Sequence, residues 1–243
     1  MEKNIFDSWL VNKLIAHRGL HDSENPENSL GAYKRAIEKN YAIEIDVRMI
    51  SDGTVIVFHD EDLKRVCGKD KYVSTLTKDE LSDCHLEGTE YTITTFEEVL
   101  KLVDGKVPLL VEIKAESKIG KLEQATYDLL KNYNGEYAVQ SFNPFSLEWF
   151  KKNAPDVWRG QLSCYFKKEN LAWWKKSLLK KLRLNKVSCP NFISYRIEDL
   201  PNRFVKRCKA LPLLVWVVKN QQQYIKAVQI CDNVIFEDFE PKI

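Results

Sequence analysis

Two carboxylates on one face of a short apolar segment constrain this chain most. In residues 42–47 (Ala-Ile-Glu-Ile-Asp-Val), apolar side chains alternate with Glu44 and Asp46. A period of two predicts a β-strand, on which Glu44 and Asp46 point to the same side. Two buried carboxylates side by side repel each other and are costly to remove from water. A shared hard cation such as Mg²⁺ or Ca²⁺, which prefers oxygen ligands, would relieve that repulsion.

Three further apolar segments lead into charged or titratable side chains. Functional groups at the carboxyl ends of several strands are typical of a parallel α/β barrel, whose chemistry lies at that face. The three segments are 13–16, which precedes His17 and Arg18; 55–58, which precedes His59; and 109–113, which contains Glu112 and precedes Lys114.

Strand-like and helix-like segments alternate along the whole chain, which favours an α/β fold. The length of 243 residues fits one barrel of about 250 residues. We therefore expect a TIM-type (β/α)8 barrel in a single domain, 1–243, with the polar and irregular residues 60–93 as a loop insertion after the third strand. The nine strand candidates, one more than a barrel needs, are 13–16, 42–48, 54–58, 109–114, 137–142, 158–163, 191–195, 212–218 and 233–237. Helices are expected after an N-cap at Asn28 and at about 95–103, 119–132, 145–153, 200–209 and 221–230.

Net charge, hydrophobicity and cysteine spacing indicate which partners and which cellular compartment to expect. The net charge of +2 is too small to indicate nucleic-acid binding. The first 13 residues have no apolar run, and no stretch approaches the roughly 18 apolar residues of a membrane-spanning helix. The six cysteines contain no CxxC pair, so we expect free thiols in a reducing compartment. These observations predict a cytoplasmic protein.

One segment, 165–187, is strongly basic. It carries eight basic side chains and one acidic one, a charge of +7, which leaves −5 on the rest of the chain. A helix over 170–183, capped by Asn170, would place leucines and Trp174 on one side and most lysines on the other. Either this helix touches an anionic membrane peripherally, or it is an ordinary surface helix whose apolar side packs on the protein.

The candidate residues together suit cleavage of a phosphodiester. Carboxylates can hold a hard cation, histidines titrate near neutral pH and can transfer protons, and basic side chains can bind phosphate. These candidates are Glu44, Asp46 and Glu112 for the metal, His17 and His59 for proton transfer, and Arg18 and Lys114 for phosphate. Three alternatives stay open: Glu44 and Asp46 on a solvent-facing edge strand, Lys114 as a mere neutralising partner of Glu112, and Phe142 and Trp216 as core residues instead of pocket-lining ones.

Eight ordered segments carry a further signal. They are His17-Arg18-Gly19; 26–29 (Pro-Glu-Asn-Ser); 44–47 (Glu-Ile-Asp-Val); Asp52-Gly53; 57–60 (Val-Phe-His-Asp) followed by Leu63, Arg65 and Gly68; 93–100 (Ile-Thr-Thr-Phe-Glu-Glu-Val-Leu); 111–114 (Val-Glu-Ile-Lys); and Gln140-Ser141-Phe142. As an ordered set, they resemble the glycerophosphodiester phosphodiesterase family.

The resemblance implies a hydrolase of glycerol and lipid metabolism that cleaves glycerophosphodiesters to glycerol 3-phosphate and an alcohol. It implies a TIM barrel, one divalent cation (Mg²⁺ or Ca²⁺) on Glu44, Asp46 and Glu112, and His17 and His59 as the acid–base pair. Phosphate would be held by Arg18 and Lys114, with Phe142 and Trp216 expected in the substrate pocket and 60–93 shaping its glycerol side.

The late part of the chain departs from the usual pattern of the family. Residues 216–220 read Trp-Val-Val-Lys-Asn where the usual pattern is Trp-Thr-Val-Asn, and Glu237 precedes Asp238 where Thr is typical. These departures put the substrate preference in doubt more than the activity. The leaving alcohol, the native metal, the attacking group (water or a substrate hydroxyl) and the oligomeric state stay open.

Three other functions compete with this interpretation. A lysophospholipase D-like enzyme would use the same site on a greasier substrate. A catalytically silent barrel that only binds lipid or phosphate would be favoured by loss of a histidine or carboxylate, and none is missing. A metal-dependent aldolase or isomerase would not need two histidines beside an anion site.

Overall fold

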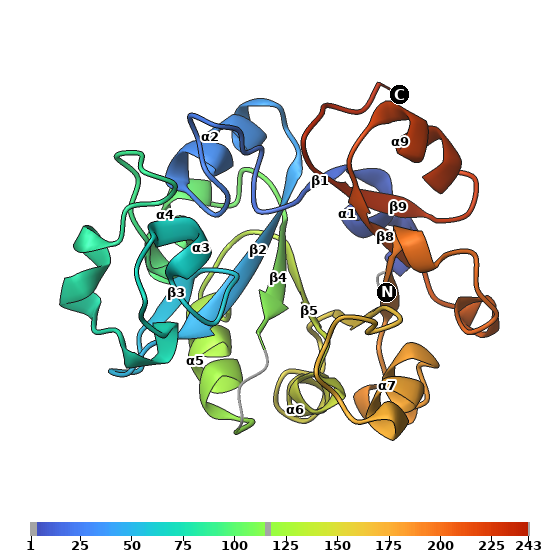
Figure 1. The fold of residues 1–243 in the computed structure, drawn as a ribbon. Coiled ribbons are helices and arrows are strands. Elements are labelled where there is room, and N and C mark those ends of the chain that lie inside the picture. Colours follow the sequence, from blue (N-terminus) through green and yellow to red (C-terminus); the bar gives the residue numbers. More distant parts are fainter. Residues whose placement is uncertain (1–3, 115–117, 243) are drawn as a thin grey trace. The chain divides into compact units, whose positions relative to one another are not determined.

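The computed structural model describes residues 4–114 and 118–242. The chain divides into two compact units, one over Ala16–Tyr137 and the other over Met1–Ile15 together with Ala138–Ile243. Each unit alternates strands with helices, as the colour scale of Figure 1 shows along the chain. The short strand β1 (Ile15–Ala16) stands where the sequence passes from the second unit into the first.

In the unit Ala16–Tyr137, strand β2 (Ala42–Met49) lies between two partners. It pairs in parallel with β4 (Leu109–Ile113) and antiparallel with β3 (Val55–Val57), to which it is joined by a turn at Asp52-Gly53. Gly53 has a φ of 90°, a backbone conformation that suits glycine and few other residues. Because β2 is central and its carboxylates are buried, the alternative of a solvent-facing edge strand is excluded.

Helices α2 (Leu30–Glu38), α4 (Phe96–Val103) and α5 (Lys121–Leu130) belong to the same unit. Each has apolar residues at helical spacing, and α4 begins with a capping box in which Thr95 and Glu98 bond each other's backbone N–H groups. Residues 60–93 form short helices, which the polar sequence did not indicate: α3 (Lys64–Cys67), η2 (Val73–Thr75) and η3 (Lys78–Asp83). They share a buried apolar cluster with Ile56 and Phe58, so this segment has its own small core.

The second unit holds five parallel strands in the order in which they occur in the chain: β5 (Tyr137–Ser141), β6 (Arg159–Ser163), β7 (Phe192–Arg196), β8 (Leu213–Val218) and β9 (Asn233–Phe236). Its helical elements are η1 (Ile5–Asp7), α1 (Trp9–Asn12), α6 (Pro144–Asn153), α7 (Trp173–Lys180), α8 (Asn185–Ser188), η4 (Ile197–Asp199), η5 (Val205–Cys208) and α9 (Gln221–Ala227). Asn233 ties the N-terminal segment to this unit by donating to the carbonyls of Leu10 and Lys13.

All nine strand candidates are strands, and β3 is the hairpin arm, because it pairs antiparallel with β2, the strand that precedes it in the chain. The helix predicted at 200–209 is present only in part, as the 3-10 helix η5. Before it, the Asn202 side chain accepts from the N–H groups of Phe204 and Val205 and fixes a turn. In the described residues, no helix is long and apolar enough to cross a membrane. The single-domain boundaries and the inserted role of 60–93 stay predictions.

Candidate active site

Three buried carboxylates come together on the central strands of the unit Ala16–Tyr137. Register pairs Asp46 of β2 with Glu112 of β4, so these two side chains share a face, and Glu44 lies two residues earlier on that face. Their exposed fractions are 1% for Glu44, 0% for Asp46 and 7% for Glu112. One ligand oxygen from each lies within 4.8 Å of the others. The structure thus brings together the three carboxylates named as metal ligands, and their binding of a metal stays a prediction.

Burial and mutual repulsion leave the cluster with uneven protonation. Burial, with the neighbouring charges of Asp46 and Glu112, raises the pKa of Glu44 well above its usual value. For Asp46, burial acts in the same direction, but Lys114, His59 and Arg18 outweigh it and hold its pKa well below the usual value. The three carboxylates thus share the positive charges of Lys114 and Arg18, and a further cation beside Glu44 would favour its ionised form. A set of buried oxygen donors of this kind fits a hard divalent cation.

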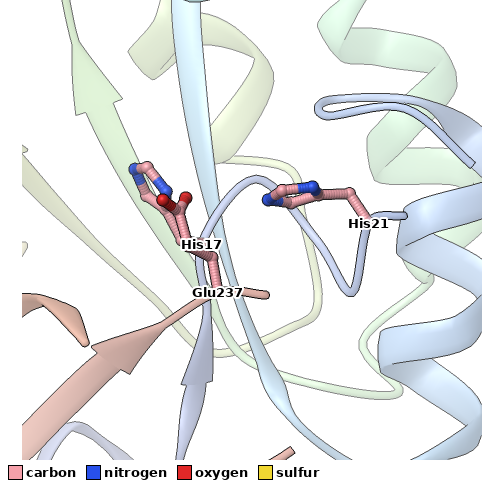
Figure 2. Close-up of side chains that lie close together, drawn as sticks. All are labelled: His17, His21 and Glu237. Atoms are coloured by element: carbon pink, nitrogen blue, oxygen red, sulfur yellow. The ribbon is translucent and has the colours of Figure 1, made fainter. Parts of the chain in front are cut away.

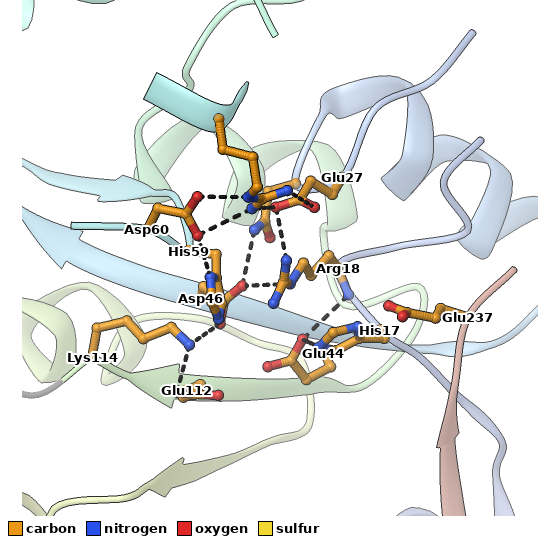
Figure 3. Close-up of polar contacts among 12 residues, drawn as sticks. His17, Arg18, Glu27, Glu44, Asp46, His59, Asp60, Glu112, Lys114 and Glu237 are labelled. Atoms are coloured by element: carbon orange, nitrogen blue, oxygen red, sulfur yellow. Dashed lines mark hydrogen bonds and ion pairs between the residues drawn. The ribbon is translucent and has the colours of Figure 1, made fainter. Parts of the chain in front are cut away.

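Lys114 stands between two of the carboxylates. Its Nζ lies 2.8 Å from Asp46 Oδ1 and 2.6 Å from Glu112 Oε1. Burial lowers the pKa of Lys114, but the attraction of the two carboxylates prevails and raises it, so the amine is a cation. Lys114 thus shares one positive charge between two carboxylates, and Figure 3 shows its ammonium group pointing at both of them.

Arg18 connects the segment after β1 with the carboxylate cluster. Its Nε lies 3.2 Å from Asp46 Oδ2, its Nη1 donates to Glu27 at 2.8 Å, and its backbone N–H donates to Glu44 at 3.2 Å. The backbone of Arg18 has a φ of 55°, in the left-handed region, and Gly19 follows with a φ of 82°. This turn directs both the amide and the side chain of Arg18 toward β2.

His59 follows strand β3 and is held by two different residues. Its carbonyl oxygen accepts from the guanidinium of Arg48 at 2.9 and 2.7 Å, and its Nδ1 lies 2.6 Å from Asp60 Oδ1. Burial acts to raise the pKa of Asp60, but hydrogen bonds from His59 and Arg65 outweigh it and lower that pKa. An ionised carboxylate only accepts, so Nδ1 of His59 carries a proton, and Nε2 is the ring nitrogen left for proton transfer.

An ionic chain extends from His59 to Arg18 through residues that the sequence argument did not single out for function. Arg65 on α3 contacts Asp60 at 2.7 and 3.1 Å and Glu27 at 2.9 and 2.6 Å. Glu27 in turn accepts from Arg18. Glu27, Asp60 and Arg65 all stood within the resembling segments, so that pattern was the available signal for them.

Asn28 is a second correction to the sequence prediction. The N-cap of α2 is Ser29, whose side chain accepts from the N–H of Ala32, and not Asn28. Asn28 has a φ of 58° and donates from its amide to Asp46 at 3.0 Å, while its carbonyl accepts from Tyr33 at 2.8 Å. Asn and Ser are both good caps, so the sequence pattern could not decide between adjacent positions. In the structure, Asn28 instead holds the Asp46 carboxylate through a hydrogen bond.

His17 and His21 both lie on the segment that follows β1 (Figure 2), with a ring nitrogen of each within 4.8 Å of the other. His17 Nε2 is 3.9 Å from Glu44 Oε2, which is too long for a hydrogen bond. His17 therefore lies beside the carboxylates, and its role in proton transfer stays a prediction. His21 had carried no sequence argument.

Phe142 and Trp216 belong to the other unit. Phe142 follows β5 and Trp216 lies on β8, and their ring centroids are 5.5 Å apart in an edge-to-face arrangement. Phe166 packs against Phe142 at 5.9 Å. Both predicted residues are partly exposed, so they form the open part of an aromatic cluster. Their contact with substrate stays a prediction.

Comparison with known proteins supports the same family as the ordered segments. The model of the glycerophosphoryl diester phosphodiesterase family matches residues 17–239. A glycerophosphodiester phosphodiesterase from Caldanaerobacter subterraneus subsp. tengcongensis is 32% identical, over 95% of this chain and 96% of its own.

This chain belongs to the glycerophosphoryl diester phosphodiesterase family. The predicted family and enzyme class are thereby confirmed. Among solved structures, an Oleispira antarctica phosphodiesterase in complex with sn-glycerol-3-phosphate is 24% identical with a TM-score of 0.76, covering 94% of both chains. A glycerophosphodiester phosphodiesterase from Thermotoga maritima is 27% identical with a TM-score of 0.69, covering 92% of this chain and 93% of its own. These likenesses confirm the TIM-type barrel fold predicted from the sequence.

Proposed function

We propose that this protein hydrolyses glycerophosphodiesters to glycerol 3-phosphate and an alcohol. The observation that carries the proposal is the assembly, in one unit of a family member, of three buried carboxylates with two histidines, Arg18 and Lys114. The names of the relatives support the substrate class, and the relative solved with sn-glycerol-3-phosphate supports the product.

Glu44, Asp46 and Glu112 would hold one divalent cation, Mg²⁺ or Ca²⁺. Three carboxylates leave coordination positions for water and phosphate oxygens, because both ions take six or more oxygen ligands. When bound, the cation supplies Lewis-acid stabilisation of the charge that develops on phosphate oxygens. Lys114, which contacts two of these carboxylates, and Arg18, which contacts one, would place positive charge beside the same phosphate.

The two histidines would divide the proton transfers between them. One accepts the proton of the attacking hydroxyl, from water or from the substrate, as the new O–P bond forms. The other donates a proton to the leaving alkoxide as the old P–O bond breaks. The ionised Asp60 fixes the ring of His59 with Nδ1 protonated, so His59 would exchange its proton through Nε2.

A substrate panel tests the proposal. Purified protein is assayed with glycerophosphocholine, glycerophosphoethanolamine, glycerophosphoglycerol and lysophosphatidylcholine, each with Mg²⁺, with Ca²⁺ and with a chelator. We expect glycerol 3-phosphate from at least one of the first three substrates and no turnover in chelator. Turnover of none of the four with either metal would contradict the proposal and favour a silent phosphate-binding barrel. Metal analysis of the chelated sample distinguishes a retained ion from metal-independent activity.

A lysophospholipase D activity is the second candidate. A human lysophospholipase D is 30% identical over 140 residues, which cover 52% of this chain and 43% of that protein. The match covers only about half of each protein, so it supports a shared type of phosphodiester cleavage more than a shared substrate. In the panel, lysophosphatidylcholine turned over faster than the three glycerophosphodiesters would favour this activity.

A further inference from the structure

Two tryptophans at the start of helix α7 point away from the protein. Trp173 is 81% exposed and Trp174 49%, and Leu171 just before the helix is 36% exposed. Trp173 is the most exposed large apolar side chain in the described residues. The helix spans Trp173–Lys180 and its N-cap is Ala172, so the predicted longer helix capped by Asn170 is wrong in its bounds.

The two ends of the basic segment 165–187 behave differently. Leu182, just beyond the helix, is buried to 7% exposure, and Leu178 and Leu179 are half-buried. This part resembles an ordinary surface helix whose apolar side packs on its own unit. No residue of α7 itself is buried, and the helix begins with the largely exposed Trp173 and the half-exposed Trp174. The free-energy cost of an apolar side chain in water grows with its exposed area. Burial against a partner would therefore be most favourable at this end of the helix.

Basic side chains surround the exposed indoles. Lys167, Lys168 and Lys175 are exposed, and Lys176 is half-buried. The ammonium of Lys175 lies over the Trp174 ring, 5.5 Å from its centroid. Glu169 is the only acidic residue in the segment, whose charge of +7 contrasts with −5 on the rest of the chain.

We propose that this surface, made of Leu171, Trp173 and Trp174 with Lys168, Lys175 and Lys176, binds peripherally to anionic lipid bilayers. Indole rings favour the headgroup region, where an apolar body and a polar N–H are both accommodated. Lysines favour the negative potential of an anionic bilayer, which strengthens binding by about fivefold for each basic side chain near the surface. The acidic remainder of the chain would be repelled by the same bilayer, so the contact is confined to this segment.

Vesicle sedimentation tests the proposal. The full chain is spun with phosphatidylglycerol–phosphatidylcholine vesicles and with pure phosphatidylcholine vesicles, at low and at high salt. We expect sedimentation with the anionic vesicles at low salt and its loss at high salt, because salt screens the lysines. Absence of sedimentation with anionic vesicles at low salt, or equal sedimentation with both vesicle types, would overturn the proposal.

Two variants and one matched control locate the contact. The variant Lys168→Glu/Lys175→Glu/Lys176→Glu should weaken binding by at least on the order of 100-fold. Trp173→Ala/Trp174→Ala should weaken it by about tenfold or more. Binding that is unchanged in either variant would overturn the proposal.

The control makes the same change in net charge on exposed lysines elsewhere: Lys34→Glu/Lys121→Glu/Lys226→Glu. It should bind far better than the first variant, and a loss as large as that of the first variant would show general electrostatic attraction and overturn the proposal. Circular dichroism and thermal melting establish that all three proteins are folded. The measurement needs no enzymatic turnover, so its outcome is independent of the proposed function.

Discussion

At the scale of single residues, the assembly around His59 depends on groups that are far apart in sequence. Asp60 orients the ring, Arg65 holds Asp60, and Glu27 joins Arg65 to Arg18 (Figure 3). When Nδ1 of an imidazole is held by a carboxylate, the orientation of the ring is fixed and Nε2 has a defined position. We therefore expect different effects from replacing a histidine and from replacing a residue that holds it.

Replacing either histidine should remove one proton transfer. We expect His17→Ala and His59→Ala each to lower kcat by on the order of 10² to 10⁴, the range of general acid–base catalysis. A phosphodiester with a good leaving group, such as p-nitrophenol, should restore turnover only in the variant that lacks the general acid. Melting curves control for folding. Normal turnover by His59→Ala would rule out the two-histidine mechanism.

Asp60 should act through His59 and not on the substrate. We expect Asp60→Asn to lower kcat by roughly 10- to 100-fold with little change in KM, because the amide can no longer hold the ring as a carboxylate does. Asp60→Glu should recover part of the loss. Glu61→Gln, an exposed neighbour in the same segment, is the matched control and should behave as wild type. An equal loss in Asp60→Asn and Glu61→Gln would refute the positioning role.

Sequence reasoning located the candidate reacting residues more completely than the residues that contact them. The carboxylates Glu44, Asp46 and Glu112 could be grouped because a two-residue period on β2 and adjacency of parallel strands suffice to bring them together. The contact of Glu27 with Arg65 joins positions 38 residues apart through a short helix that no periodicity indicated. Asn28 was misassigned because cap preference is a local signal, whereas its partner Asp46 is distant in sequence.

At the scale of elements, α3 is fastened to the site by charge. Burial raises the pKa values of Glu27 and Asp60, but the hydrogen bonds and charge of Arg65, with further groups, outweigh it and lower both. A carboxylate with a lowered folded-state pKa contributes stability above its ordinary pKa and loses it as the pH falls through the lowered value. The folded protein should therefore lose stability as the pH falls below about 4.

Removing Arg65 should reduce that acid sensitivity. Arg65→Met is expected to be less stable at pH 7, by about 1 kcal/mol after allowance for its half-exposed guanidinium. Its melting temperature should then fall less steeply than that of wild type between pH 5 and pH 3. Lys101→Met breaks an exposed pair with Glu97 on α4 and should leave the pH profile nearly unchanged. Parallel profiles of wild type and Arg65→Met would contradict the argument.

Strands β2 and β4 should be stabilised together by a cation. An ion that binds the folded state alone raises stability by RT ln(1 + [L]/Kd), about 2.7 kcal/mol at 100 times Kd. We expect Mg²⁺ or Ca²⁺ to raise the melting temperature of wild type and to raise it less in Glu44→Gln, whose amide is a poorer ligand. Glu98→Gln, a carboxylate of the α4 cap, is the control and should keep the full metal-dependent shift. Identical shifts in wild type and Glu44→Gln would remove Glu44 from the metal site.

Regular elements were predicted better than irregular ones for a physical reason. Each of the nine strands has a continuous or alternating apolar pattern that burial imposes. The segment 60–93 buries scattered single residues such as Leu63, Val66 and Leu81. Its helices are so short that the buried apolar residues do not repeat at a helical or strand period that the sequence could reveal. The helix predicted at 200–209 is shortened to the 3-10 helix η5, and the turn that precedes it is held by the side chain of Asn202, a local contact that no periodicity indicates.

At the scale of the whole molecule, all six cysteines are free thiols. None is in a disulfide, as the sequence predicted. Burial raises the pKa of Cys67 and of Cys231 to about 12 and that of Cys164 to about 11. Such thiols are protonated at neutral pH and therefore react slowly, since the thiolate is the nucleophile. The cytoplasmic location stays a prediction.

Cys189 is the one exposed cysteine, and Lys151 Nζ lies 3.0 Å from its Sγ. Because its thiol is exposed whereas the other five are buried or partly buried, Cys189 should be the thiol that reacts first. With a thiol reagent at pH 7.5, the folded protein should show one fast equivalent and five slow ones, and the unfolded protein six fast ones. Cys189→Ser should abolish the fast phase, whereas Cys208→Ser should preserve it. A fast phase that survives Cys189→Ser would mean that a buried thiol is opened by local unfolding of the folded protein.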